Sequence, residues 1–395
     1  MKGILLKPGR ERSVLHRHPW VFSGALQESG TILEDGETVR LVNSKGDFLA
    51  WGAYSGRSNI RVRIWSWDPD EIIDDKFFRV RLQKAIQARQ SFISTQETNA
   101  LRLVHGESDW LPGLIVDRYA KTLVVQFLSC GAEYWREIIV GILSEITGAE
   151  QIFERSEISV RELEGLPERA GLLIGSSPPD FLEIHENGLR FLVDIVNGQK
   201  TGFYIDQRQN RSRVRQLASG KKVLDCFSYT GGFAVYALAG GASSILAVES
   251  SVESIALGIR NLELNGFSTT KFAWQEGDVF KVLRSLRDRA EYFDMIILDP
   301  PKYAPTSSHI QKAARAYKDI NLLAFKLLNP GGLLFTFSCS GGINLELFQK
   351  IVAGAAYDAG VQAQVLDRMY QSPDHPVSLY FPEGAYLKGL VIRIQ

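Results

Sequence analysis

The stretch KKVLDCFSYTGGFAVYALAGGASSILAVES, residues 221–250, decides the fold of this chain. It contains an apolar strand, KKVLDCF, then a helix, GGFAVYALAGG, and then a second strand, SILAVES. The alternation continues to the strand FDMIILDPP, which precedes a long helix ending at Asn329-Pro330-Gly331-Gly332, and to the strand LLFTFSCS, which precedes a further helix. The last two strands, VQAQVLDRMY and AYLKGLVIRIQ, are joined by a Pro-rich loop, 371–384. Alternating β and α segments of this kind predict an α/β fold with a parallel, doubly wound, Rossmann-like sheet.

Composition limits the classes to which the chain can belong. Its 395 residues carry 45 Lys+Arg and 45 Asp+Glu, so bulk positive charge does not attract nucleic acid, and any such surface is local. The three cysteines, Cys130, Cys226 and Cys339, form no C-x-x-C pair, and we predict no metal site. No apolar run has the ~18 residues of a membrane span, and no signal peptide is evident. We therefore expect a cytoplasmic protein that does not contact a membrane.

The sequence before the doubly wound region divides into two parts. Residues 1–70 read as short alternating strands separated by glycines, which predicts a small β-barrel, and Pro69 marks a boundary. Residues 74–96 then show helical spacing, and residues 100–165 mix strand and helix. Asn187-Gly188 lies between two alternating runs, which is a strong signal for a two-residue hairpin turn.

The first strand end of the sheet predicts where a ligand binds. In a doubly wound sheet, ligands bind beyond the carboxyl ends of the strands. The first such end is Asp225-Cys226-Phe227-Ser228-Tyr229-Thr230-Gly231-Gly232. Its glycines do not form the G-x-G-x-x-G pattern that holds a pyrophosphate, which disfavours an NAD-dependent oxidoreductase.

Carboxylates also end the next two strands. Glu249 follows Asp225 by 24 residues, a spacing that suits hydrogen bonds from ribose hydroxyls, and Asp278 can accept a hydrogen bond from an adenine amino group. Each acid precedes a helix, so N-capping explains any one of them equally well. Three acids at successive strand ends favour a ribose and an adenine without phosphate, as in S-adenosylmethionine (SAM), which becomes S-adenosylhomocysteine (SAH) on methyl transfer.

The fourth strand ends in Asp299-Pro300-Pro301-Lys302-Tyr303. The prolines hold the backbone extended and remove two N–H donors, so carbonyls and the Asp299 carboxylate can face a planar substrate. A rigid turn is the simpler explanation of Pro-Pro. A related motif, Asp/Asn-Pro-Pro-aromatic, occurs in enzymes that methylate exocyclic nitrogens, but here Lys302 intervenes.

Cys339 follows the fifth strand, in FSCSGG, and is predicted at the same cleft. A thiolate that adds to C6 of a pyrimidine makes C5 electron-rich enough to take a methyl group. Buried packing is the commonest fate of a cysteine, and we assign it to Cys130 and Cys226. The flanking serines and glycines favour a catalytic role for Cys339.

Two basic segments favour contact with RNA. Residues 200–222 carry seven Lys+Arg and one Asp, and residues 1–24 carry five Lys+Arg and one Glu. A solvated surface is the usual meaning of such runs. On a chain of zero net charge, RNA contact is the favoured interpretation. The predicted RNA contacts are Arg17, His18, Trp20, Lys200, Lys302 and Tyr303.

The ordered motifs HRHPWVFSGA, GESDWLPGLIVDRY, KTGFYIDQR, CFSYTGGFAV, DPPKY, YKDIN, FSCSG and FPEGAYLKG run through nearly the whole chain. With them the sequence resembles the ribosomal RNA large subunit methyltransferase I family, the 23S rRNA 5-methylcytosine methyltransferases. The resemblance implies an RNA-binding PUA domain over residues 1–72, a central α/β domain with a β-hairpin over 73–190, and a class I SAM-dependent methyltransferase domain over 191–395.

The resemblance also implies roles for single residues. Cys339 would be the nucleophile. As a separate hypothesis of our own, Asp299 protonates or hydrogen-bonds the N3/N4 edge of cytosine. The cofactor loop would contribute Asp225, Phe227, Tyr229, Gly231 and Gly232, with Glu249, Asp278, Asp299 and Pro300 at the neighbouring strand ends. Tyr204, Asp206, Gln207 and Arg208 would close over the methionine end of SAM.

Several alternatives stay open at the level of the sequence. Lys302 occupies the place where many RNA 5-methylcytosine enzymes have a second cysteine, and a single late cysteine with Asp-Pro-Pro is also the pattern of RNA 5-methyluridine methyltransferases. An exocyclic-nitrogen methyltransferase would leave Cys339 as packing. An RNA-binding ribosome assembly factor would leave the SAM pocket without catalysis. The expected partner is 23S rRNA or a large-subunit precursor, and a homodimer is the default assembly.

Overall fold

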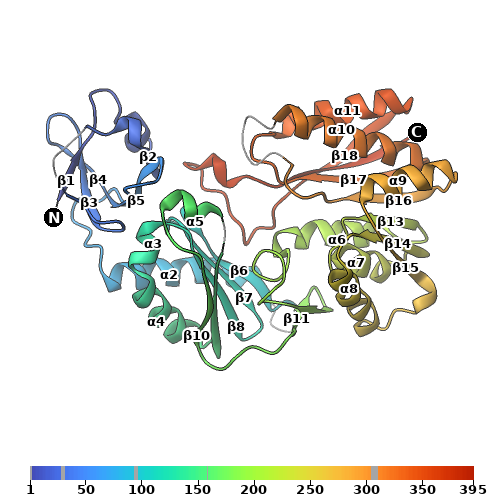
Figure 1. The fold of residues 1–395 in the computed structure, drawn as a ribbon, viewed down its shortest axis with the longest axis horizontal. Helices are drawn as coiled ribbons and strands as arrows, with labels where there is room; N and C mark the ends of the chain where they lie inside the picture. Colours follow the sequence, from blue (N-terminus) through green and yellow to red (C-terminus); the bar gives the residue numbers. More distant parts are fainter. Residues whose placement is uncertain (1, 28–31, 93–96, 158, 304–309) are drawn as a thin grey trace. The chain divides into compact units, whose positions relative to one another are not determined.

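The computed structural model describes residues 2–27, 32–92, 97–157, 159–303 and 310–395, and these form two compact units (Figure 1). Unit 1 contains residues 1–185, 193–205 and 373–384. Unit 2 contains residues 186–192, 206–372 and 385–395. Neither unit is one continuous stretch, because residues 373–384 fold with the N-terminal part of the chain. The division into domains at 72/73 and 190/191 stays a prediction.

Unit 1 begins with a five-stranded sheet in the order β1-β3-β4-β5-β2, in which only the β1–β3 pair is parallel. Its core consists of apolar side chains such as Val39, Leu41 and Val62, all fully buried. This is the small β-structure that the short alternating runs predict. Its elements are β1 (Gly3–Leu5), α1 (Arg12–Leu15), β2 (Trp20–Phe22), η1 (Ser23–Ala25), β3 (Thr38–Val42), β4 (Phe48–Tyr54) and β5 (Ile60–Ser66).

Unit 1 also contains a second five-stranded sheet, ordered β10-β9-β8-β7-β6. Its one parallel pair, β8–β9, is joined through α3 and α4, as a crossover requires. Asp74 caps α2 by accepting a hydrogen bond from Phe77 N. The elements are α2 (Asp75–Arg89), η2 (Gln90–Phe92), β6 (Ala100–His105), η3 (Gly106–Asp109), β7 (Leu114–Tyr119), β8 (Thr122–Phe127), α3 (Cys130–Tyr134), α4 (Arg136–Thr147), β9 (Gln151–Ser156), α5 (Ser159–Glu164) and β10 (Arg169–Ile174).

The segment 373–384 is fixed in unit 1 by buried polar contacts. The guanidinium of Arg89 donates to the carbonyl oxygen of Asp374, and Arg102 N donates to the Asp374 carboxylate at 3.0 Å. Asp109 accepts two hydrogen bonds of 2.6 Å from Arg89. The sequence predicts only a proline-rich loop at 371–384, so these contacts are a new finding.

The predicted hairpin is confirmed, with strands β11 (Leu182–Glu186) and β12 (Leu189–Val193). Asn187 and Gly188 both have positive φ, 50° and 77°, as a type I′ turn requires. Glycine adopts this backbone without a steric penalty, and asparagine is among the few other residues that tolerate it.

Unit 2 contains a seven-stranded sheet in the order β15-β14-β13-β16-β17-β19-β18. The first five strands pair in parallel, and β19 runs antiparallel to both β17 and β18. The predicted doubly wound sheet is therefore confirmed. The strands are β13 (Lys222–Cys226), β14 (Ser244–Glu249), β15 (Phe272–Glu276), β16 (Phe293–Leu298), β17 (Leu328–Ser338), β18 (Ala363–Tyr370) and β19 (Lys388–Ile394).

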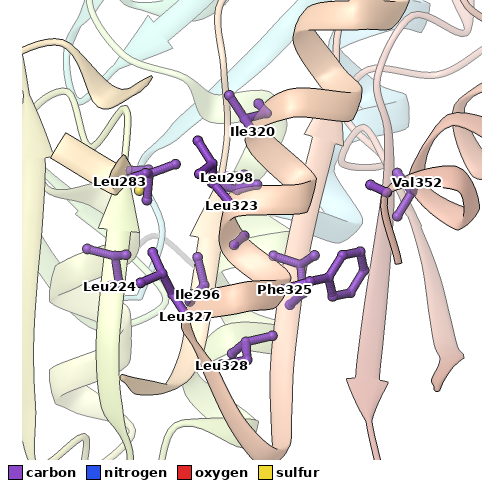
Figure 2. Close-up of a cluster of buried hydrophobic side chains, with 14 of the residues drawn as sticks. Leu224, Leu283, Ile296, Leu298, Ile320, Leu323, Phe325, Leu327, Leu328 and Val352 are labelled. Carbon is purple, nitrogen blue, oxygen red and sulfur yellow. The ribbon is translucent and has the colours of Figure 1, made fainter. Parts of the chain in front are cut away.

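Helices cover both faces of this sheet (Figure 1). The helices α6, α7 and α8 lie on one face, and α9, α10 and α11 lie on the other, where they enclose the core of Figure 2. In that core, Leu224, Ile296 and Leu298 of the strands meet Leu323 and Leu327 of α10. The helices are α6 (Arg208–Leu217), α7 (Gly232–Ala239), α8 (Val252–Leu264), α9 (Val279–Asp288), α10 (Ile310–Leu327) and α11 (Leu345–Ala359).

One element boundary in unit 2 differs from the expectation. The sequence predicts that the long helix ends at Asn329-Pro330-Gly331-Gly332, but α10 ends at Leu327 and these residues belong to β17. Leu328 already pairs with Phe293 of β16, and the register shifts before Leu333 pairs with Met295. The turn residues therefore form an irregularity within the strand.

No helix in the described part of the chain is long and apolar enough to cross a membrane.

Removal of the cation from a buried ion pair should destabilise unit 2 strongly. Arg211 of α6 donates two hydrogen bonds, of 2.8 and 2.7 Å, to the buried carboxylate of Glu186. Arg211→Leu leaves this carboxylate buried without its cation, so we expect a loss of about 3–5 kcal/mol in the free energy of unfolding. Arg213→Leu on the same helix removes a half-exposed pair with Asp367 and should cost about 0–1 kcal/mol. Equal losses in chemical denaturation would contradict this ranking.

Candidate active site

The candidate site of unit 2 lies at the carboxyl edge of its sheet. β13 pairs with β14 on one side and with β16 on the other, so the strand order changes direction at β13. The ends of β13, β14, β16 and β17 therefore meet at a switch point, where doubly wound sheets bind ligands. The predicted site residues at these strand ends are Asp225–Gly232, Glu249, Asp299 and Cys339, and their role in binding a ligand stays a prediction.

The loop after β13 bends sharply through three left-handed residues. Phe227, Tyr229 and Gly231 have φ values of 60°, 49° and 79°. The left-handed conformation is unfavourable for a residue with a Cβ atom, and such outliers concentrate at ligand sites. Ser228 N donates to Val248 O at 3.1 Å, and Gly231 N donates to Ser228 O at 2.9 Å. These bonds hold the bend, which leads into α7 at Gly232.

Asp225 is the buried acid of this loop. Its side chain is fully buried, and Oδ2 accepts a hydrogen bond of 2.5 Å from Ser228 Oγ. Burial raises the pKa of Asp225 to about 7, and the nearby Asp299 carboxylate raises it further, while the Ser228 hydrogen bond opposes the shift. The backbone N–H of Ala234 at the start of α7 also lowers the pKa of Asp225, although no hydrogen bond to Oδ1 of ordinary geometry forms among the described residues. Oδ1 therefore keeps room to accept a further hydrogen bond.

Glu249 supports the same loop from the end of β14. Oε2 accepts a hydrogen bond from Tyr229 N at 2.9 Å, and Oε1 accepts from Ser250 N at 2.7 Å and Ser251 N at 3.1 Å. A carboxylate has about four acceptor positions, so Oε2 retains capacity for a ribose hydroxyl. Sequence reasoning gave this acid a ligand role and missed its role in fixing the loop.

Asp278 is the predicted acid at the end of the third strand, two residues beyond β15. It caps α9, because its Oδ1 accepts a hydrogen bond of 3.0 Å from Lys281 N. The capping explanation therefore applies to Asp278, whose side chain is exposed. A second acceptor oxygen remains, so its adenine contact stays a prediction.

The segment before α6 brings polar side chains to the end of β16. Gln207 is buried, and its Nε2 donates a hydrogen bond of 2.9 Å to Asp299 Oδ2. Asp206 Oδ2 accepts from the Tyr386 hydroxyl at 2.6 Å, and Arg208 is buried beside them in the chain. Tyr204 belongs to unit 1, where its hydroxyl donates to Gln199 and the Lys200 ammonium lies 5.3 Å from its ring centroid.

Cys339 follows β17 directly, and its half-buried thiol is not part of a disulfide. We call residues 338–343, which surround it, the thiol turn. Ser340 Oγ lies 3.2 Å from the Tyr317 hydroxyl, and Lys388 Nζ donates to the carbonyl oxygens of Ser340 at 2.7 Å and Ile343 at 2.6 Å. The other two cysteines are buried, and burial raises the pKa of both thiols, to about 12 for Cys130 and well above its usual value for Cys226.

Tyr303, which follows β16, places an aromatic ring beside Tyr317 of α10. Its ring centroid lies 5.0 Å from that of Tyr317, and its buried hydroxyl has no hydrogen-bond partner among the described residues. Burial raises the pKa of Tyr303 above its usual value. Pro300 is buried behind it, and Lys302 is exposed to solvent. This arrangement suits a planar, polar ligand.

The predicted RNA contacts in unit 1 occupy different environments. Trp20 Nε1 donates to Glu107 Oε1 at 2.7 Å, and its ring packs on Phe381 at 4.7 Å, so the indole is held within the unit. His18 Nε2 lies 3.3 Å from the Glu383 carboxylate. Arg17 is exposed and has a left-handed backbone with φ 63°. Of these three, Arg17 is the one most open to a phosphate.

Sequence reasoning missed a basic pocket beside α1. It has a volume of about 680 Å³. Phe22, which is half exposed, supplies an aromatic face next to cationic side chains. The basic run 1–24 could have indicated a cationic pocket. The sequence does not show that Phe22 is the aromatic residue that faces outward, because this depends on the register of β2. The lining residues are Gly9, Arg10, Arg12, Ser13, His16, Phe22, Gly24 and Ala25.

Among the described residues, no group of three or more His, Cys, Asp or Glu side chains is arranged to hold a metal ion.

Two family models match the chain. Residues 155–392 match an S-adenosylmethionine-dependent methyltransferase, and residues 4–67 match a PUA-like domain. The first match covers the switch point described above, including the buried acceptor of Asp225 and the carboxylate of Glu249. The fold and site thus define a SAM-dependent methyltransferase that carries a PUA-like domain. The match to this family confirms the predicted cofactor, SAM.

Curated relatives extend over the whole chain. The ribosomal RNA large subunit methyltransferase I of Tolumonas auensis is 51% identical over 391 residues, which cover 99% of this chain and 98% of that protein. Proteins of the same name from Aeromonas salmonicida and Escherichia coli are 49% and 47% identical over 99% of this chain, and 98% and 99% of theirs. The chain belongs to the ribosomal RNA large subunit methyltransferase I family.

Solved structures share the fold. A protein from Streptococcus mutans, described as a SAM-dependent methyltransferase, superposes with a TM-score of 0.85 at 23% identity over the full length of both chains. A methyltransferase structure in complex with SAH gives a TM-score of 0.87 at 22% identity, again over both full chains.

The raised pKa of Asp225 predicts a pH-dependent stability. Between about pH 4 and 7 the folded protein keeps a proton on this carboxyl that the unfolded chain releases. The stabilisation that Asp225 contributes to the folded state is therefore complete below about pH 4 and is lost as the pH rises through 7. Asp225→Asn stays neutral, so without SAM its Tm relative to the unsubstituted protein should rise from pH 5 to 8, by roughly 2–4 °C per kcal/mol.

Asp288→Asn is the matched control, because Asp288 is an exposed acid at the end of α9 that pairs with its neighbour Arg287. Its Tm difference should stay constant over this range. If the plots of Tm against pH are parallel for Asp225→Asn and the unsubstituted protein, the pKa of Asp225 is not raised in the folded state. At pH 8, where Asp225 is ionised, Asp225→Asn should also reduce the affinity for SAM at least tenfold in calorimetry, since it removes a charged acceptor.

Proposed function

We propose that this chain methylates C5 of a cytosine in 23S rRNA, through a covalent bond between Cys339 and C6 of the base. The observation that carries the proposal is the half-buried thiol of Cys339, which is not part of a disulfide and lies at the sheet edge that also presents the Asp225 loop. Methylation of an aromatic pyrimidine carbon needs covalent activation, whereas methylation of nitrogen or oxygen does not. Family membership supports rRNA as the substrate class.

The chemistry divides between Cys339 and the cofactor. The Cys339 thiolate donates an electron pair to C6 and forms an S–C6 bond, and the C5=C6 π electrons become available at C5. SAM supplies a methyl group on a sulfonium as the electrophile for C5. Loss of the C5 proton to a base then restores the C5=C6 bond, and the S–C6 bond breaks to release the thiolate. No atom of Cys339 remains in the product.

Asp225, Glu249 and Asp278 are the residues that we assign to the cofactor. Oδ1 of Asp225 can accept a hydrogen bond from a cationic donor, and the remaining acceptor position of Glu249 suits a ribose hydroxyl. The left-handed residues Phe227 and Tyr229 shape the loop between them. Asp206, Arg208 and Tyr204 complete the proposed set at the methionine end.

RNA recognition is proposed on both units. The PUA-like domain contributes the basic pocket beside α1, with Arg17 exposed close by in sequence. In unit 2, Lys302 and Tyr303 follow β16, where an extruded base would meet them. The run 200–222 contributes less than its charge suggests, because Arg208 and Arg211 are buried. Lys200 is exposed and stays in the proposed set.

Uracil is the second candidate base. Lys302 follows Asp299-Pro300-Pro301 at the place where a second cysteine would assist release of 5-methylcytosine. Without that cysteine, the local motif fits a 5-methyluridine enzyme equally well. The thiol chemistry is the same for both bases, so only the identity of the product separates them.

The decisive experiment uses isotopically labelled SAM and 23S rRNA that lacks its modifications. We expect the label in 5-methylcytidine after digestion and mass spectrometry. Label in 5-methyluridine would keep the mechanism and change the base. Label in an N-methylated nucleoside would overturn the role of Cys339. SAM binding without any label on free rRNA would direct the assay to a ribosomal particle.

Cys339→Ser tests the covalent step directly. A hydroxyl is a far weaker nucleophile than a thiolate, so we expect methyl transfer to fall by several orders of magnitude while the Kd of SAM stays unchanged. Cys130→Ser is the matched control, because Cys130 is buried in unit 1 against Ser55 and should keep full activity. Methyl transfer by Cys339→Ser at the rate of the control would remove the covalent mechanism.

Asp299→Ala tests the contact that we propose between Asp299 and the N3/N4 edge of cytosine. Turnover should be abolished while SAM still binds, because Gln207 and the loop after β13 remain in place. A loss of SAM affinity in calorimetry would instead assign Asp299 to the cofactor. Normal turnover would show that neither role is needed.

A further inference from the structure

Lys388 of β19 forms hydrogen bonds with the thiol turn, which contains Cys339. In the antiparallel pair of β17 and β19, Lys388 lies opposite Ser338, the residue before the thiol. Its Nζ donates to the carbonyl oxygens of Ser340 and Ile343 at 2.7 and 2.6 Å. One ammonium therefore fixes the part of the thiol turn that follows Cys339.

The charge of Lys388 is buried without an acid. The residue is 6% exposed, and none of the ion pairs among the described residues includes it. A buried ammonium costs several kcal/mol unless a counter-charge compensates it. Two carbonyl dipoles satisfy two of its three N–H donors, but they do not neutralise the charge. Such a cation favours the formation of a nearby anion.

The titratable groups that surround Lys388 identify that anion. Its pKa falls to about 8, chiefly because burial disfavours the charged form. An ionised Cys339 raises the pKa, and the charge of Lys302 lowers it. Tyr317 and Tyr303 also face the thiol, and burial raises the pKa of both, so each stays neutral at pH 7. Cys339 is therefore the group close to Lys388 that can become an anion.

We propose that Lys388 is a positioning residue for methyl transfer, which fixes the thiol turn and stabilises the thiolate of Cys339 with its ammonium. The inference rests on the proposed function, because it assumes that Cys339 acts as a thiolate. The S–H proton passes to solvent, and the negative sulfur pairs electrostatically with Nζ until its electron pair forms the bond to C6. When that bond breaks, the same ammonium stabilises the departing thiolate.

Neutral variants separate the charge of Lys388 from its hydrogen bonds. Lys388→Gln keeps an N–H donor but removes the charge, and Lys388→Arg keeps the charge. Lys326→Gln removes an exposed lysine on α10 and serves as the control for a remote change of charge. If Lys388→Gln does not fold, Lys388→Met replaces it in the experiment, because it also removes the charge and keeps an apolar side chain of similar length.

The experiment measures the rate at which iodoacetamide alkylates Cys339 in the full-length protein from pH 6 to 10, by mass spectrometry of the Cys339 peptide. Lys388→Gln should move the midpoint of the profile up by at least one pH unit, which lowers the rate at pH 7 about tenfold. Lys388→Arg and Lys326→Gln should keep the original midpoint. An unchanged midpoint in a folded neutral variant would overturn the proposal.

Methyl transfer by the same variants distinguishes the two proposals. A shifted thiol profile together with slower methyl transfer in Lys388→Gln, restored in Lys388→Arg, supports both. A shifted profile with unchanged methyl transfer keeps the electrostatic role of Lys388 and rejects the covalent role of Cys339. Slower methyl transfer with an unchanged profile rejects the role of Lys388 in ionising the thiol.

Discussion

The parallel pairing of β13 with β14 and β16 is the constraint on which the site depends. It brings the ends of neighbouring strands to one edge, so residues distant in sequence, such as Asp225 and Asp299, become electrostatic neighbours. The Asp299 carboxylate disfavours ionisation of the fully buried Asp225, and burial disfavours it more strongly. The fold thus places an acid that is difficult to ionise at the edge of the sheet.

Much of the fold could be predicted because its signals are local. The alternation of apolar strands with helices predicts the sheet of unit 2, and Asn187-Gly188 predicts its hairpin turn by backbone conformation alone. The position of Asp225 and Glu249 at the ends of strands can also be predicted from the sequence, because it requires no knowledge of tertiary contacts. Asp278 shows the limit of this reasoning, because a cap and a ligand have the same sequence signature.

The other features of the fold and of the candidate site depend on contacts between distant residues, which no local sequence pattern indicates. The sequence around Trp20 reads as an exposed RNA contact, yet its indole pairs with Glu107, which lies 87 residues away. The run 200–222 reads as a basic surface, yet Arg211 is buried against Glu186. Lys388 appears in the sequence as an ordinary strand lysine. Its importance emerges only from the antiparallel register that sets it opposite Ser338.

The strand order also has a consequence for how the chain folds. β19 follows β18 in the sequence but lies between β17 and β18 in the sheet. During synthesis, β18 therefore emerges before the strand that it must pair with, and residues 373–384 must first reach unit 1. These non-local pairings raise the contact order and slow folding. Until β19 inserts, β17 presents an open edge that is exposed to association with other chains.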